Sequence, residues 1–237
     1  MIASVHVADI GARSGLRALR STPKPAQVAG LRSVTTALAA PLRGSLLPSP
    51  ELGRVALVAF WDDDAALDQF LAHDPVAAEL AGGWHVRLAP LRAWGTWPGL
   101  PTELTKSRAV DHDGPAAVLT LARVRLSQAV RFVRTSAKAE AAVLHAEGLI
   151  WATGLGRPPF VATCSLWESA QAASDYAYGS ATAAHSNAIA ADKAKPFHHQ
   201  SAFIRFRPYD SEGGLGGSNP LADGWTSAAR VDRAAEG

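Results

Sequence analysis

Phe160-Val-Ala-Thr-Cys-Ser-Leu-Trp167 opens the stretch of sequence that decides the fold, which runs on to Pro208. Apolar residues dominate these positions and turn residues precede them, a pattern typical of a buried strand. The stretch continues through a helical pattern that carries one histidine, His185, and it closes with a second strand pattern, Phe203-Ile-Arg-Phe-Arg-Pro208. The stretch therefore predicts a strand, a helix and a second strand.

The same order of elements occurs earlier in the chain, which indicates an internal repeat. Phe60-Trp61-Asp62, at the end of another apolar run, lies 106 residues before Leu166-Trp167-Glu168. The closing strand has its counterpart 118 residues earlier, in His85-Val-Arg-Leu-Ala-Pro90. The two spacings differ because the second half is longer between Tyr176 and Phe203, where His185 sits.

Each half reads strand, helix, strand, strand, helix, strand, which is the order of a ferredoxin-like unit. In the first half the second helix is predicted from Asp64 to Ala81, and the carboxylates of Asp62, Asp63 and Asp64 suit its N-terminal turn. One such unit exposes an apolar sheet face, which a second copy can bury. The sequence therefore predicts an α+β fold of two ferredoxin-like βαββαβ repeats packed as a pseudo-dimeric α/β barrel.

We expect four regions along the chain. These are a first ferredoxin-like repeat over 1–98, a linker over 99–114, a second repeat over 115–210 that carries His185, and a tail over 211–237. Gly99, Pro101 and Gly114 mark the linker, since glycine and proline are typical of turns. The tail is rich in glycine, serine and alanine.

Composition limits the classes of function. The chain has 237 residues, of which 48% are hydrophobic, enough to bury a sizeable core. The 23 basic and 21 acidic residues nearly cancel, so no charge footprint for nucleic acid is visible. Cys164 is the single cysteine, which fits a reducing, cytoplasmic setting. No signal-peptide pattern begins the chain, and its longest apolar run is too short for an integral membrane segment.

His185 is the candidate for chemistry, because alanine, serine and threonine surround it from Gly179 onward. A helix face of small residues leaves space for a broad ligand, and one neutral imidazole suffices as the axial ligand of a haem. The alternative is a capped, alanine-rich surface helix with an exposed histidine, since alanine is a good helix former. Neither a nucleotide-binding fingerprint nor a nucleophilic triad is convincing in the sequence.

The chain resembles the spheroidene monooxygenase-like family. The motifs that carry the resemblance are Ser165-Leu-Trp167, Tyr176-Ala-Tyr-Gly179, the His185-x-x-Ala-Ile189 box, Phe203-Ile-Arg-Phe-Arg207 and Gly217-Ser-Asn-Pro-Leu221. The resemblance implies a haem-dependent monooxygenase on a dimeric α/β-barrel type of fold, with heme b bound through His185 as the proximal iron ligand. It implies an apolar or secondary-metabolite substrate. The box here reads Thr182-Ala-Ala-His185, where the family has a Gly-Gly-Pro-His form.

The same resemblance extends to residues around the cofactor. Arg205 or Arg207 would pair with a haem propionate, and Trp167, Tyr176 and Phe197 would pack on the porphyrin. A solvated strand face and ordinary core aromatics are the alternatives.

Two other functions remain open. One is a haem enzyme that uses iron as a Lewis acid for dehydration or nitrogen chemistry, as aldoxime dehydratases do. The other is a cofactor-free barrel that binds a small molecule. The expected partners are a small apolar substrate and an electron donor that the sequence does not identify, in a monomer or a homodimer.

Overall fold

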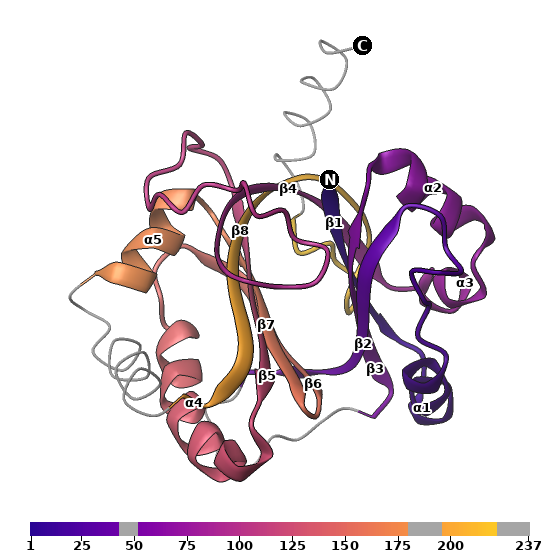
Figure 1. Ribbon diagram of the computed structural model, residues 1–237, viewed down its shortest axis with the longest axis horizontal. Helices are drawn as coiled ribbons and strands as arrows, with labels where there is room; N and C mark the ends of the chain where they lie inside the picture. The colour runs from indigo at the N-terminus through magenta and orange to yellow at the C-terminus, as the bar shows by residue number, and fades with distance from the viewer. Residues whose placement is uncertain (43–51, 180–195, 222–237) are drawn as a thin grey trace.

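The computed structural model describes residues 1–42, 52–179 and 196–221, which form a closed barrel with helices on its outside (Figure 1). Its strands follow one another around the barrel in the order β1-β3-β2-β6-β7-β5-β8-β4, and neighbours are antiparallel. The elements are β1 (Ile2–Asp9), α1 (Ala12–Arg20), β2 (Leu31–Pro41), β3 (Arg54–Trp61), α2 (Asp64–His73), α3 (Pro75–Leu80), β4 (Trp84–Gly95), β5 (Ala116–Val124), the 3-10 helix η1 (Leu126–Gln128), α4 (Ala129–Val143), β6 (Leu149–Arg157), β7 (Phe160–Trp167), α5 (Ala170–Tyr178) and β8 (His198–Gly213).

The barrel consists of two equivalent halves. The first four strands lie in the order β4-β1-β3-β2 and the last four in the order β8-β5-β7-β6, the same arrangement in each half. Two seams join the halves, one between β2 and β6 and the other between β4 and β8. The helices of the two halves lie on opposite sides of the barrel (Figure 1). The predicted pair of ferredoxin-like βαββαβ repeats in a pseudo-dimeric α/β barrel is confirmed.

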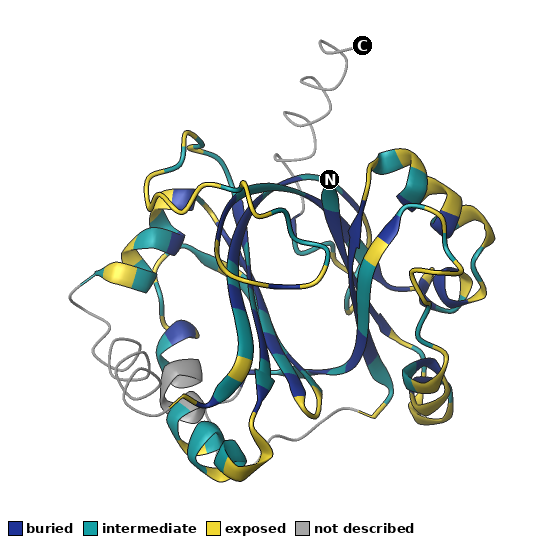
Figure 2. Ribbon diagram, viewed as in Figure 1, coloured by how far each residue is buried: buried dark blue, intermediate teal, exposed yellow. Residues whose placement is uncertain are grey.

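β3 shows why the apolar runs form strands. Seven of its eight residues are buried, because one face of the strand packs in the barrel interior and the other packs under the helices. Val58 and Phe60 face the barrel interior, whereas Leu57 and Trp61 face the helices. Buried residues therefore follow the barrel wall, and exposed residues gather on the surrounding helices and loops (Figure 2).

Two glycines mark the repeat in the backbone. Gly30 and Gly148 have φ angles of 71° and 74°. A Cβ atom on Gly30 would lie 2.4 Å from the Cβ of Ala66, and one on Gly148 would lie 2.7 Å from the Cβ of Ala172. Both the positive φ and the close approach of a helix require glycine at these positions.

The prediction of one helix from Asp64 to Ala81 is wrong, because the chain forms two helices there, α2 and α3. Pro75 has no backbone N–H and begins the second helix, which the Asp74 carboxylate caps by accepting a 2.8 Å hydrogen bond from the N–H two residues ahead. Of the three aspartates before α2, Asp63 is the cap, and its carboxylate accepts a 2.9 Å hydrogen bond from an N–H of the first turn.

β4 and β8 are longer than their sequence patterns predict, since β4 reaches Gly95 and β8 runs from His198 to Gly213. The two strands pair with each other along the seam, and this pairing extends both. No helix within the described ranges is long and apolar enough to cross a membrane.

Candidate functional site

The outer faces of the two halves differ in how completely their helices cover them. In the first half, Leu57 and Trp61 are fully buried under the helices. The residues 106 positions further on are Thr163 and Trp167, and Thr163 stays partly exposed. In the described part of the second half, the sheet around Thr163 is therefore partly accessible.

Small side chains line this accessible face, which we call the outer floor. The strand registers of the two halves show which positions correspond. Thr120 in the second half corresponds to His6 in the first, and Gly156 corresponds to Leu38. Both replacements remove volume above the sheet, which gives a broad ligand room to lie there. The outer floor consists of Val118, Thr120, Ala122, Ala152, Gly154, Gly156, Val161, Thr163 and Ser165.

Trp167 and Tyr176 meet at one edge of the outer floor, with ring centroids 5.2 Å apart. The buried Trp167 indole donates a hydrogen bond to the Ser165 hydroxyl at 2.9 Å. Burial raises the pKa of Tyr176 to about 12, so its phenol stays protonated at neutral pH. Trp61 and Phe70 make the matching contact in the first half at 5.0 Å, so a hydroxyl group is what distinguishes the second half here.

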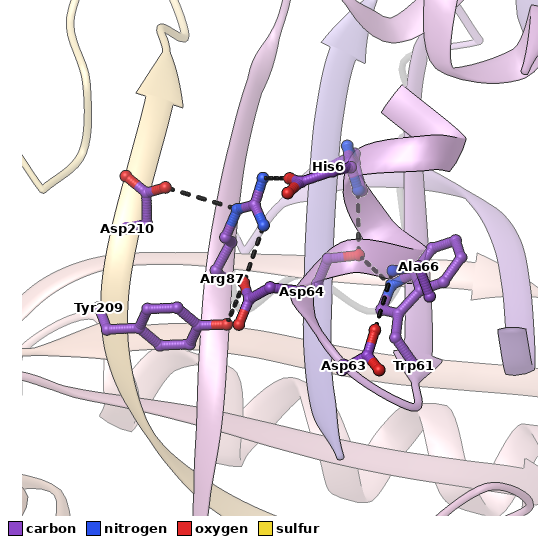
Figure 3. Close-up of polar contacts among 10 residues, drawn as sticks. His6, Trp61, Asp63, Asp64, Ala66, Arg87, Tyr209 and Asp210 are labelled. Carbon is purple, nitrogen blue, oxygen red and sulfur yellow. Dashed lines mark hydrogen bonds and ion pairs between the residues drawn. The ribbon is translucent and has the colours of Figure 1, made fainter. Parts of the chain in front are cut away.

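Arg87 of β4 shows how the first half accommodates a buried arginine. Its guanidinium pairs with Asp64 at 2.8 Å, Asp68 at 2.5 Å and Asp210 at 3.4 Å (Figure 3). The Tyr209 hydroxyl donates to Asp64 at 2.8 Å. Burial lowers the pKa of Arg87, but hydrogen bonds to Asp68 and Asp64 outweigh burial, so the pKa is raised above its ordinary value. Arg87 is therefore a neutralised, structural cation.

Arg205 of β8 occupies the matched position, 118 residues further on, and is 6% exposed, close to the 8% of Arg87. Within the described part of the chain, the Arg205 side chain makes no hydrogen bond or ion pair. It faces Arg92 across the seam between β4 and β8, whereas Arg87 faces Asp210. Burial lowers the pKa of Arg205, the charge of Arg92 lowers it further, and Tyr178 opposes the shift.

Arg92 is also 6% exposed. Its Nη1 donates to the Tyr178 hydroxyl at 3.1 Å, and its Nη2 donates to the Lys106 carbonyl at 3.1 Å. Its Nε is enclosed and makes no hydrogen bond with the residues described. The Arg108 guanidinium lies over the Tyr178 ring, 4.3 Å from its centroid. Positive charge therefore gathers at the end of α5.

The structure brings part of the predicted site together. Trp167 and Arg205 lie at the same end of the sheet, on β7 and β8, which flank β5. Arg207 lies two residues beyond Arg205, half-buried on the same face. Phe197 is buried at the opposite end of β5, beside α4, and is not part of this group. His185 belongs to residues 180–195, which lie outside the described part of the chain.

Sequence reasoning missed Arg92, because the first-half strand pattern ends at Pro90. The repeat spacing contains the signal that would have found it, since Arg92 lies 118 residues before Asp210, the residue that faces Arg87. Because Arg92 and Asp210 occupy matched positions but carry opposite charges, the two halves differ in charge at this point. In the described ranges, no three His, Cys, Asp or Glu side chains gather where they could hold a metal ion.

Two solved structures share the fold of this chain. A crystal structure of aldoxime dehydratase has a TM-score of 0.52 at 10% identity, over 94% of this chain and 87% of that chain. A second aldoxime dehydratase, in complex with butyraldoxime, has a TM-score of 0.50 at 8% identity, over 88% and 79%. At such low identity the likeness shows the fold alone.

Sequence relatives give a more specific likeness, although no family model matches the chain. A spheroidene monooxygenase of Rubrivivax gelatinosus is 35% identical over 173 residues, 69% of this chain and 64% of that protein. One of Cereibacter sphaeroides is 29% identical over 191 residues, 76% of this chain and 57% of that protein. The chain thus matches less than two thirds of the length of either relative. These relatives confirm the resemblance to the spheroidene monooxygenase-like family that the motifs predict.

Proposed function

We propose that the chain is a haem-dependent monooxygenase that oxidises an apolar substrate, and that the cofactor lies on the outer floor of the second half. The observation that carries the proposal is the contrast between the two outer faces, because the first is filled by the buried Leu57 and the second is partly open at the matched Thr163. The relatives support the reaction, since their name assigns them monooxygenase activity on spheroidene.

The described residues fit the needs of a haem in two respects. A haem requires a broad, largely apolar surface, and its propionates require cationic or hydrogen-bonding partners. The outer floor supplies the surface, and Arg205, with Arg207 beside it, supplies positive charge at its edge. The remaining requirement is an axial donor, and we assign this role to His185 on the family motif.

The bound cofactor would supply dioxygen activation, and the chain supplies position and surroundings. Trp167 is held in one orientation by its hydrogen bond to Ser165, so it forms a fixed edge for the ligand. Burial raises the pKa of Tyr176 to about 12, so its side chain adds no negative charge beside the ligand. The outer floor carries no ionisable side chain in its described positions, which suits an apolar substrate.

The absorbance spectrum of protein produced with a supply of haem tests the proposal. We expect a Soret band that is lost or shifted in His185→Ala. The matched control is His73→Ala, which removes an exposed histidine of α2 in the first half and should leave the band unchanged. A full, unshifted band in His185→Ala rules out this ligand. Turnover that needs ferrous iron but no dioxygen would select the Lewis-acid alternative.

A further inference from the structure

The surroundings of Arg205 lack the three carboxylates that surround Arg87. Asp64 and Asp68, which pair with Arg87, lie on α2, and the third partner, Asp210, faces Arg87 across the seam. At the matched positions around Arg205 stand Ala170, Ser174 and Arg92. Each of the three carboxylates around Arg87 thus corresponds to an uncharged or a basic residue around Arg205.

Such a pair of buried arginines is unfavourable by itself. A buried cation without a counter-ion loses hydration and gains nothing in return, and a second cation beside it adds repulsion. Across the ranges that the structure describes, neither Arg92 nor Arg205 forms an ion pair with a carboxylate. An unsatisfied buried group of this kind points to a missing anion.

The geometry of the pair suits a carboxylate. Each guanidinium is a planar fork of donors that matches two oxygen atoms at once. Arg92 is held by Tyr178 and Lys106 while its Nε stays enclosed and unbonded among the described residues. Arg205 lies directly opposite it in the register. Ser165, Val118 and Arg205 follow one another across the sheet, so the pair adjoins the outer floor.

We propose that Arg92 and Arg205 together bind a carboxylate of the ligand that lies on the outer floor, with Tyr178 holding Arg92 in position. The identification of that ligand rests on the proposed function, under which the carboxylate is a haem propionate. A carboxylate of a substrate has the same chemistry. Arg92 is then a ligand-binding residue contributed by the first half to a site in the second.

Titration of the protein with hemin and with hemin dimethyl ester, followed by absorbance, tests the pair. We expect Arg92→Met and Arg205→Met each to raise the Kd for hemin about tenfold or more, the size of one lost charge-assisted hydrogen bond. The same variants should not change the Kd for the ester, whose propionates carry no charge. Arg13→Met, which removes an exposed charge from α1, is the control and should match the wild type. Arg205→Lys keeps the charge without the fork and should lose part of the affinity.

Thermal unfolding in succinate separates this proposal from the proposed function. If hemin does not bind at all, the proposed function fails, but a rise in Tm with succinate that disappears in Arg205→Met still supports a carboxylate site, filled by a substrate. Equal hemin affinities in the wild type and both arginine variants overturn the propionate assignment. If succinate also stabilises wild type and variants equally, or none of them, the carboxylate site itself is overturned. Circular dichroism of each variant verifies its fold.

Discussion

Arg87→Met should destabilise the protein and Arg205→Met should not, although the two arginines occupy matched positions. Arg87→Met leaves the carboxylates of Asp64, Asp68 and Asp210 without their shared cation. Arg205→Met removes a charge that has no ion-pair partner in the described part of the chain. Methionine preserves most of the buried side-chain length in both variants, so the comparison isolates charge.

The structure sets the size of each effect. The Arg87 side chain is 9% exposed, but those of Asp64 and Asp68 are 48% and 59% exposed and can regain water. The Asp210 side chain, at 17%, cannot fully do so. Removing one partner of a buried ion pair costs about 3–5 kcal/mol, so partial exposure places Arg87→Met near the lower end, at about 3 kcal/mol. Replacing an unpaired buried charge by an apolar residue is neutral or stabilises by about 1–2 kcal/mol.

Urea unfolding at pH 7 of haem-free protein, followed by circular dichroism, measures both changes in the free energy of unfolding. We expect a lower transition midpoint for Arg87→Met and an equal or higher one for Arg205→Met. An equal loss in both variants would refute the reasoning, because it would mean that Arg205 is as well neutralised in the folded protein as Arg87.

Further predictions concern the backbone, the thiol and a buried histidine. Gly30→Ala and Gly148→Ala should each lower the free energy of unfolding by about 1–3 kcal/mol in urea titrations, because both sites have positive φ and a Cβ would overlap a helix. Burial raises the pKa of Cys164 to about 12, so a disulfide reagent at pH 8 should label it only after unfolding. Burial, and then two basic neighbours, lower the pKa of His6 to about 3. The contribution of neutral His6 to the free energy of unfolding is therefore complete above the pKa of histidine in the unfolded chain, near 6.5. This contribution is lost as the pH falls toward 3. Between pH 7 and pH 5 the wild type should lose about 2 kcal/mol more than His6→Thr, and equal losses in the two proteins would contradict the buried, neutral histidine.

Local sequence patterns predicted the strands well where both faces of a strand are buried. The run from Arg54 to Trp61 is β3 and the run from Phe160 to Trp167 is β7, because continuous apolar sequence needs cover on both sides. The repeat then determined the barrel, since two equivalent half-barrels close on each other. Asp74 and Pro75 divide the predicted helix in two, because the Asp74 carboxylate caps a new helix and Pro75 begins it.

The arginine pair could not be found from local pattern. Arg92 follows the expected end of its strand, and only pairing with β8 extends that strand far enough to set it opposite Arg205. The charge reversal becomes visible once the register across the seam is known. Likewise, the small size of Thr163 or Gly156 has no meaning in sequence until the matched Leu57 and Leu38 are seen to fill the other half.

Filling the outer floor tests the central claim, that the second half holds the cofactor, most directly. Thr163→Leu with Gly156→Leu installs the side chains that the first half carries at matched positions, and a Cβ at Gly156 has open space around it. Hemin titration of this double variant, followed by absorbance, should show a Kd at least about tenfold higher than in the wild type, or no Soret band, in a protein that remains folded. An unchanged hemin affinity would contradict the claim and place the cofactor elsewhere.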